Sequence, residues 1–408
     1  MQVTGIIAEY NPFHNGHLYQ INKIRTQSDA RIIAVMSGSF TQRGEATLLD
    51  KWERARLAVL CGCDLVLELP FVFACRSAQD FARGGVALLS RLGIVDTLAF
   101  GAEHDDITAL TELAAELDKP AVQARLHQTV GQGRSYAQAI TDILGTDNDT
   151  TCILHQPNNI LALEYLRSLQ LLSSPLKPLL IARQGAGYHE PKLAGTLASA
   201  TAIRRHLYNS GAVEELQPSL PPAVYERLRN ITATELPQMN RLLLPLKTKL
   251  LTSQIADLQA CYGVNEGLEN RICDCARQAA DWTSLIKAVT TKRYPSSRIA
   301  RTLMYLLLGL SSAEMAAFSG QGPLYARLLA ASPRGKEMLH SIKIHSSIPL
   351  LTKTSQYLTS QKRCQNPADL PPLAAMLRYD TLATDLRALT CPAGTARNDF
   401  QQSPLFLA

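Results

Sequence analysis

An apolar run, a proline turn and two closely spaced histidines open this chain, and they constrain its fold more than any other stretch. Residues 3–8 are apolar and have the length of a buried strand. Pro12 ends that strand, because it lacks a donor N–H and disfavours helical backbone at Asn11. A helical pattern follows over residues 18–24. The sequence therefore predicts a first strand, a tight turn and a first helix.

The two histidines, His14 and His17, lie between this predicted strand and the predicted helix. A helix N-terminus offers unpaired N–H groups and partial positive charge, so it attracts phosphate. Gly16 removes a side chain where a nucleotide must approach closely. A single histidine here is more often a surface or cap residue. Two histidines that flank a glycine instead favour stabilisation of charge during attack on the α-phosphate of a nucleotide, with pyrophosphate leaving.

Strand and helix patterns alternate through the first half of the chain. After the first strand, apolar runs at residues 31–36, 64–69, 97–101 and 179–183 read as strands, with helical patterns between them. This alternation predicts an α/β fold with a Rossmann-like parallel sheet, followed by a mostly helical part. Ligands bind at the carboxyl ends of such strands. Gly101 and Arg183 end two of them and are therefore candidate site residues, although Gly101 also fits a plain turn.

Two further polar segments are candidates for nucleotide contacts. Ser199 or Thr201 begins a helix whose early turns carry Arg204, so hydroxyl, N–H and guanidinium groups come together there. An ordinary N-cap explains the same spacing about equally well. Asn158 and Asn159 begin another helix and could hydrogen-bond adenine or ribose, but simple capping is an equal alternative.

Length and charge divide the chain into two unlike halves. The 408 residues suggest two domains, which we place at 1–211 and 212–408, where strand patterns give way to helical ones. Residues 1–150 carry 13 basic and 18 acidic residues, a net charge of −5, whereas residues 151–408 carry 28 and 17, a net charge of +11. A basic second half favours a phosphate-backbone partner. Basic excess is also common on solvated surfaces.

The densest basic patch lies at residues 292–301 and holds Tyr294 among its cations. Cations can grip an RNA backbone while an aromatic ring stacks on a base. A helix N-terminus with solvated arginines is the simpler alternative. The candidate tRNA-binding residues are Lys292, Arg293, Arg298 and Arg301.

Several classes of protein are disfavoured. No run of about eighteen apolar residues occurs, and the N-terminus has no basic segment with a cleavage site, so we expect neither a membrane protein nor a secreted one. The nine cysteines are scattered, and their C-x-C pairs have no matching second pair. We therefore expect reduced thiols, no protein-held metal site and a cytoplasmic location.

The string from Gly5 to His17, Gly-Ile-Ile-Ala-Glu-Tyr-Asn-Pro-Phe-His-Asn-Gly-His, closely resembles the bacterial tRNA(Met) cytidine acetate ligase family. This family belongs to the nucleotidyltransferases that share a His-x-Gly-His motif. The resemblance extends through residues 37–50, 100–101, 157–159, 183 and 199–204 to the basic patch. It implies activation of acetate with ATP and Mg²⁺ to acetyl-adenylate, and acetylation of N4 of the wobble cytidine in the anticodon loop of elongator tRNA(Met). It implies no DNA partner.

The resemblance also implies roles for individual residues. His14, His17 and Arg204 are the expected catalytic residues. The expected ATP-binding residues are Ile7, Ala8, Glu9, Tyr10, Asn11, Pro12, Phe13, His14, Asn15, Gly16, His17, Gly101, Asn158, Asn159, Arg183, Ser199 and Thr201.

Two other functions compete with this one. An adenylyltransferase that joins AMP from ATP to a small phosphate ester would share the nucleotide site, but it does not need a basic helical half of about two hundred residues. A non-catalytic RNA-binding protein with a regulatory nucleotide pocket would fit the basic patch. Two intact nucleotidyl motifs argue against it.

Overall fold

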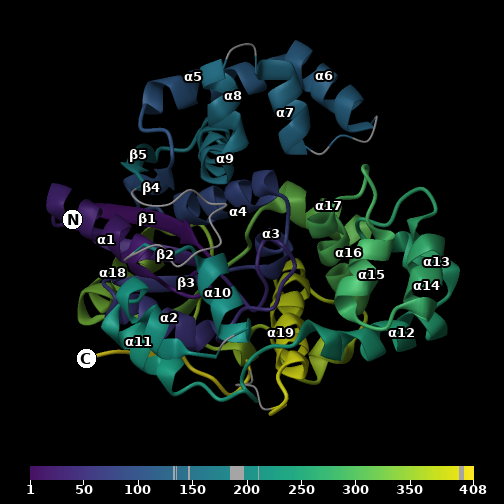
Figure 1. Cartoon of the computed structure of the whole chain (residues 1–408). Coiled ribbons are helices and arrows are strands. Elements are labelled where there is room, and N and C mark those ends of the chain that lie inside the picture. Colours follow the sequence, from purple (N-terminus) through teal and green to yellow (C-terminus); the bar gives the residue numbers. More distant parts are fainter. Residues whose placement is uncertain (132–133, 135, 146–147, 184–196, 210, 395–398) are drawn as a thin grey trace.

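A mixed sheet with helices on both faces forms the centre of the molecule (Figure 1). The structure is a computed structural model and describes residues 1–131, 134, 136–145, 148–183, 197–209, 211–394 and 399–408. The strands are β1 (Val3–Ala8), β2 (Arg31–Ser37), β3 (Leu65–Leu69), β4 (Thr97–Ala102), β5 (Lys177–Ala182), β6 (Ala326–Ala331), β7 (Leu350–Leu351) and β8 (Leu405–Phe406).

The strand order confirms the Rossmann-like prediction. The sheet runs β5-β4-β1-β2-β3-β6-β7, and β8 pairs with β6. Strands β1 to β5 are parallel, and β6 adds antiparallel to β3. The chain builds outward from β1 to β3 and then returns to the other side of β1 with β4. In such a sheet, ligands bind outside the carboxyl ends of the strands at this switch point, which lies here between β1 and β4.

Both faces of the sheet are buried, as β2 illustrates. Ile33 and Val35 pack in one apolar cluster, while Ile32, Ala34 and Met36 pack in another. Alternate residues of a strand point to opposite faces, so β2 has an apolar cluster on each side. The helices of the Ile32 face are α1 (Asn15–Gln27), α2 (Lys51–Leu60), α10 (Ala200–Asn209) and α11 (Pro222–Arg229). Those of the Ile33 face include α3 (Phe71–Ala74), α4 (Ala78–Arg91), α9 (Pro157–Leu171), α18 (Pro333–His345) and α19 (Pro372–Thr390).

Two further groups of helices extend from this centre (Figure 1). One lies beyond α4 and α9 and consists of α5 (Ile107–Leu117), α6 (Pro120–Gly131), α7 (Tyr136–Leu144) and α8 (Asn148–His155). The other, green in Figure 1, consists of α12 (Leu243–Thr252), α13 (Ile255–Ala260), α14 (Leu268–Gln278), α15 (Trp282–Val289), α16 (Ser296–Leu308) and α17 (Ser312–Gln321). Within the described residues, no helix combines the length and the apolar character needed to cross a bilayer.

The second half of the chain is mostly helical, as predicted, but it also returns to the sheet. All six residues of β6 are buried, and β6 pairs with β3. Its sequence, Ala-Arg-Leu-Leu-Ala-Ala, is rich in good helix formers and lacks β-branched residues, so local propensity gave no strand signal. The division at residue 211 stays a proposal, with β6, β7 and β8 belonging to the same sheet as the first half.

Candidate active site

A cavity of about 280 Å³ opens at the carboxyl ends of β1, β4 and β5, at the switch point of the sheet. Fourteen of the predicted site residues line it, although they come from five separate segments of the chain. They are Ile7, Ala8, Glu9, Tyr10, Asn11, His14, Gly16, His17, Gly101, Asn158, Arg183, Ser199, Thr201 and Arg204.

The two histidines are fixed by reciprocal bonds at the start of α1. His14 is the N-cap, and its Nδ1 accepts the Gly16 N–H at 3.0 Å. The Nδ1 of His17 accepts the His14 N–H at 3.2 Å, and the two ring centroids are 3.9 Å apart. A neutral imidazole carries its proton on the nitrogen that does not accept. Both rings therefore hold their proton on Nε2 and present hydrogen-bond donors.

Burial keeps both rings neutral. The pKa of His14 is lowered to about 3 by desolvation and by the nearby Arg183 guanidinium. The pKa of His17 is lowered well below 6.5 by desolvation, by His14 and by Arg183. The site thus offers neutral N–H donors at a helix N-terminus, which is the arrangement that binds and stabilises phosphate oxygens.

The position of the His14 ring also requires glycine at residue 16, in addition to the access that glycine gives a nucleotide. A Cβ on Gly16 would lie 2.8 Å from Cε1 and 3.0 Å from Nδ1 of His14. Only a residue without a side chain leaves the His14 ring where it is. The other ring, His17, rests against Tyr10 and Phe13 at centroid distances of 4.9 and 5.3 Å.

Arg204 joins three parts of the site. Its guanidinium donates to the Asn11 carbonyl at 2.8 Å and lies 3.2 Å from the Glu45 carboxylate. It stands in the second turn of α10, whose N–H at Ala202 is capped by the Ser199 hydroxyl at 3.2 Å. The N-cap alternative for Ser199 therefore holds, and it is compatible with a site role because the capped helix begins at the cavity wall.

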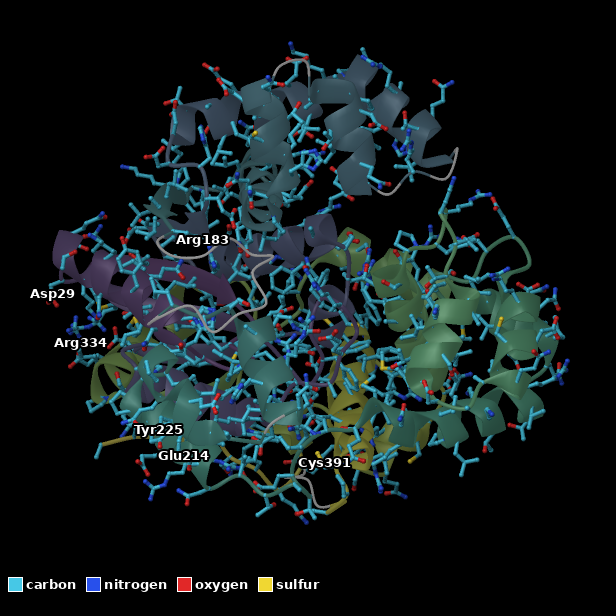
Figure 2. The ribbon with its side chains drawn as sticks, in the orientation of Figure 1. Asp29, Arg183, Glu214, Tyr225, Arg334 and Cys391 are labelled. Carbon is cyan, nitrogen blue, oxygen red and sulfur yellow. The ribbon has the colours of Figure 1, made fainter. Side chains whose placement is uncertain are left out.

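Arg183 follows β5 directly, and Figure 2 shows it just below the helices α5 to α9. Its side chain is 40% exposed, and its Nε lies 3.7 Å from the Glu103 carboxylate. A Cβ on Gly101 would meet the Arg183 side chain at an ordinary 3.4 Å, so alanine would fit here without a clash. Arg183 is thus a cation at the cavity wall that remains accessible to an anionic ligand.

Four predicted ATP-binding residues lie outside the cavity wall. Asn159 is buried and accepts the backbone N–H groups of Glu103 and His104, so it ties α9 to the segment after β4. Phe13 and Pro12 are buried, and Phe13 packs in the apolar core. Asn15 donates to the carbonyl of Pro218 at 2.9 Å. We do not carry these four into the proposed site. Asn158, in contrast, lines the cavity.

The structure adds cavity residues that no sequence signal singled out. They include Ala78 and Phe81 from α4 and Tyr165 from α9. Gln42 and Arg43 also line the cavity, and they come from the loop after β2, which lies within the segment covered by the family resemblance. Three buried polar atoms among the lining residues have no hydrogen-bond partner, namely Asn11 Nδ2, Gln42 Nε2 and Tyr165 Oη. Such atoms cost free energy unless a ligand satisfies them. The loop that carries Gln42 lies at the carboxyl end of β2, where ligands bind in open α/β sheets.

Comparison with known proteins identifies the family of the chain. The family model described as HIGH Nucleotidyl Transferase matches residues 1–403. A protein of Syntrophotalea carbinolica named tRNA(Met) cytidine acetate ligase is 41% identical over 99% of both chains. The protein of that name from Clostridium kluyveri is 37% identical over 100% of this chain and 99% of its own. The chain belongs to the tRNA(Met) cytidine acetate ligase family.

Solved structures of a member of this family have the same fold. The apo structure of Thermotoga maritima TmcAL superposes with a TM-score of 0.88 at 32% identity, over 100% of both chains. A second structure of that protein, bound with α-thio ATP, superposes with a TM-score of 0.87 at 31% identity over the same share.

The predicted tRNA-binding residues of this family member lie on and beside α16. Lys292 and Arg293 are exposed, and Arg293 pairs with Glu266. Arg298 covers the Tyr294 ring, with its guanidinium 4.6 Å from the ring centroid. Arg301 donates to the Gln42 carbonyl at 3.2 Å, so it touches the loop that lines the cavity. The basic patch therefore begins next to the candidate active site.

A polar groove of about 670 Å³ borders this patch. Arg293, Tyr294 and Arg298 line one side of it, and His127 and Val130 of α6 line another. Glu266 and Glu269 also line it, so its charge is mixed.

Proposed function

We propose that the protein is an ATP-dependent ligase that activates acetate as acetyl-adenylate and transfers the acetyl group to N4 of the wobble cytidine of elongator tRNA(Met). The observation that carries this proposal is the pair of neutral histidines whose Nε2 donors stand at the N-terminus of α1 in a cavity at the switch point. The names of the curated relatives and the α-thio ATP in the Thermotoga maritima structure support it.

In the first step a carboxylate oxygen of acetate attacks the α-phosphorus of ATP in line, an O–P bond forms, and pyrophosphate leaves with the electron pair of the broken P–O bond. The Nε2–H groups of His14 and His17 donate to the phosphate oxygens as negative charge shifts onto them. Arg183 and Arg204 balance charge at the cavity wall. The unpaired Asn11 Nδ2 is a further donor for the nucleotide.

Mg²⁺ is expected with the triphosphate, where it would neutralise charge. Among the described residues, no group of three or more His, Cys, Asp or Glu side chains gathers to hold a metal. Mg²⁺ usually keeps several waters and binds through phosphates with one or two carboxylates. The cavity fits that mode, since Glu9 and Glu45 line it, and we propose that the ion arrives with ATP.

The tRNA would dock on the basic side of the molecule. Lys292, Arg293, Arg298 and Arg301 would contact its backbone, and the groove beside α16 would take part of the anticodon stem or loop. The wobble base must leave the stack to reach the cavity, as is usual when single-stranded RNA is read. We expect this reaction to take place in the cytoplasm.

A direct test is acetate-dependent exchange of labelled pyrophosphate into ATP, which requires reversible formation of acetyl-adenylate. Exchange that needs acetate and is lost on replacing His17 supports the ligase. Exchange or pyrophosphate release that needs a small phosphate ester instead supports a dinucleotide-forming adenylyltransferase. Tight tRNA binding without either reaction supports the non-catalytic alternative.

The docking surface is tested by salt-dependent tRNA binding. Lys292→Ala should lower affinity for tRNA and reduce the slope of log affinity against log salt by about 0.7–0.9, because one phosphate contact is lost. Its pyrophosphate exchange should equal that of the wild type. An unchanged salt slope for Lys292→Ala and for Arg298→Ala together would place the tRNA elsewhere.

A further inference from the structure

A tight hairpin over residues 39–47, in the loop after β2, forms one wall of the cavity. Phe40 pairs antiparallel with Ala46, and the Thr41 N–H donates to the Glu45 carbonyl at 2.9 Å. The residues of this hairpin that line the cavity are Thr41, Gln42, Arg43 and Glu45. A shift of the hairpin would therefore move polar and charged side chains at the proposed site of adenylation.

The hairpin is joined to α10 and to the motif that carries the two histidines. The N–H of Leu48, which follows the hairpin, donates to Oδ1 of Asn11 at 2.7 Å. Glu45 pairs with Arg204 at 3.2 Å, and Arg204 donates to the Asn11 carbonyl at 2.8 Å. The position of the hairpin thus helps to set the position of the Arg204 guanidinium relative to the motif.

On its other side, the tip of the hairpin rests against α16. The guanidinium of Arg301 donates from Nη1 to the Gln42 carbonyl at 3.2 Å. Gly44 has a φ of +78°, and a Cβ there would lie 2.8 Å from the Arg301 backbone nitrogen and 2.9 Å from the Ala300 carbonyl carbon. Both the left-handed backbone and the close approach require glycine. The tip therefore touches the backbone of α16 directly.

Aromatic side chains connect the base of the hairpin to the same helix. Phe40 packs edge-on against Phe71 of α3, with ring centroids 6.2 Å apart, and Phe71 packs in the same way against Tyr305 of α16 at 6.4 Å. All three side chains are buried, and the Tyr305 hydroxyl donates to the Cys75 carbonyl. Close-packed interiors resist displacement, so α16 is a fixed support for the hairpin.

Arg301 differs from the other basic residues of its patch. Lys292 and Arg293 are exposed, whereas Arg301 is half-buried and its guanidinium reaches back to the hairpin. A hydrogen bond from a charged donor is stronger than one between neutral groups. The bond to the Gln42 carbonyl is therefore a strong side-chain link between α16 and the hairpin tip.

We propose that Arg301 is a positioning residue for the adenylation step, the attack of acetate on the α-phosphorus. By holding the Gln42 carbonyl it keeps the hairpin of residues 39–47 in place at the cavity, and so fixes the pair of Glu45 and Arg204. This deepens the proposed function and rests on it. Because Arg301 also belongs to the basic patch proposed for tRNA, the tRNA surface and the adenylation cavity share one rigid wall.

The test is the single-turnover rate constant for formation of acetyl-adenylate, measured without tRNA at saturating acetate, with the protein in excess over labelled ATP. Loss of stability alone lowers the amount of folded protein but leaves this rate constant unchanged. Arg301→Gln should lower it about 10- to 100-fold, because small displacements of groups at a reacting centre cost rates of this size. Arg301→Lys keeps a charged donor and should be slowed less than Arg301→Gln.

Gly44→Ala tests the same contact from the side of the hairpin, since the added Cβ pushes the tip off α16, and it should also slow the step. Two changes at one contact are not additive. The double variant should therefore be at most about threefold slower than the slower single variant. Slowing by the full product of the two single effects overturns the proposal, as does a wild-type rate constant for Arg301→Gln.

The matched control is Arg277→Gln, which removes an exposed arginine on α14 that pairs with Asp274. Its rate constant should equal that of the wild type. Equal slowing of Arg277→Gln and Arg301→Gln overturns the proposal, because loss of positive charge in general would then explain the effect. A wild-type protein that forms no acetyl-adenylate from ATP and acetate overturns the proposed function instead.

Discussion

Replacing His17 by asparagine separates two roles of this side chain, accepting a backbone N–H and donating to the phosphates. Its Nδ1 accepts the His14 N–H at 3.2 Å, and its Nε2 is the donor assigned to the phosphates. The Oδ1 of an asparagine can take the place of Nδ1, but the residue has no group that reaches the position of Nε2. Glutamine does the reverse, because its amide nitrogen reaches that position while the short backbone contact is lost.

The expected loss follows from the number of donors removed. One preorganised donor to charge that develops in a transition state is worth about 10²–10³ in rate, or about 2.7–4 kcal/mol. His17→Asn should therefore exchange pyrophosphate about 10²–10³-fold more slowly at saturating ATP and acetate. Its unfolding free energy should fall by about 0.5–1.5 kcal/mol, because the ring contacts with Tyr10 and Phe13 are lost. His17→Gln should keep more activity than His17→Asn and lose about 0.5–1.5 kcal/mol of stability with the hydrogen bond.

Exchange by His17→Asn at close to the wild-type rate would refute the assignment of Nε2 as a phosphate donor. So would a ranking in which His17→Gln is the slower of the two, because the backbone contact would then be the part that matters.

Three more predictions follow from the site and the core. The pKa of His14 is about 3 in the folded protein, so the unfolded chain binds a proton that the folded chain does not, and the free energy of unfolding should fall as the pH drops from about 6.5 towards 3. In urea unfolding, His14→Asn, which keeps an N-cap side chain, should lose less stability over this pH range. Equal losses in the two proteins would contradict a buried neutral ring. Gly16→Ala should push the His14 ring aside and slow pyrophosphate exchange about 10- to 100-fold, while circular dichroism stays that of wild type. Lys51→Met should cost about 3–5 kcal/mol in urea unfolding, since Glu68 and Asp399 would lose a buried partner, whereas Lys119→Met at an exposed site should change it by less than about 0.5 kcal/mol.

Local patterns predicted the sheet half well, because there the periodicity and the tertiary structure agree. Apolar runs with the length of strands became β1 to β5. The motif residues His14 and His17 came to a strand end as expected, since a βα unit leaves little freedom there. Sequence spacing could not show that both Nδ1 atoms are occupied, which decides what these rings can do.

Contacts between segments far apart in the chain could not be predicted from the sequence. Lys51 stands in the first turn of a helix, where a solvated side chain is the usual outcome, yet it is fully buried and pairs with Glu68 and Asp399. Asp399 comes from the far end of the chain and also pairs with Arg327 of β6. The same limit hid Tyr165, whose position in an amphipathic helix gives no sign that it faces a cavity.

Incubation with ATP, Mg²⁺, labelled acetate and tRNA that lacks the modification tests the central claim most directly. After digestion to nucleosides, we predict label in N4-acetylcytidine from elongator tRNA(Met), dependent on ATP and absent with His17→Asn. Acetate-dependent exchange by the same preparation shows that the protein is active. No label in RNA under those conditions, or label in a nucleoside other than cytidine, would contradict the account.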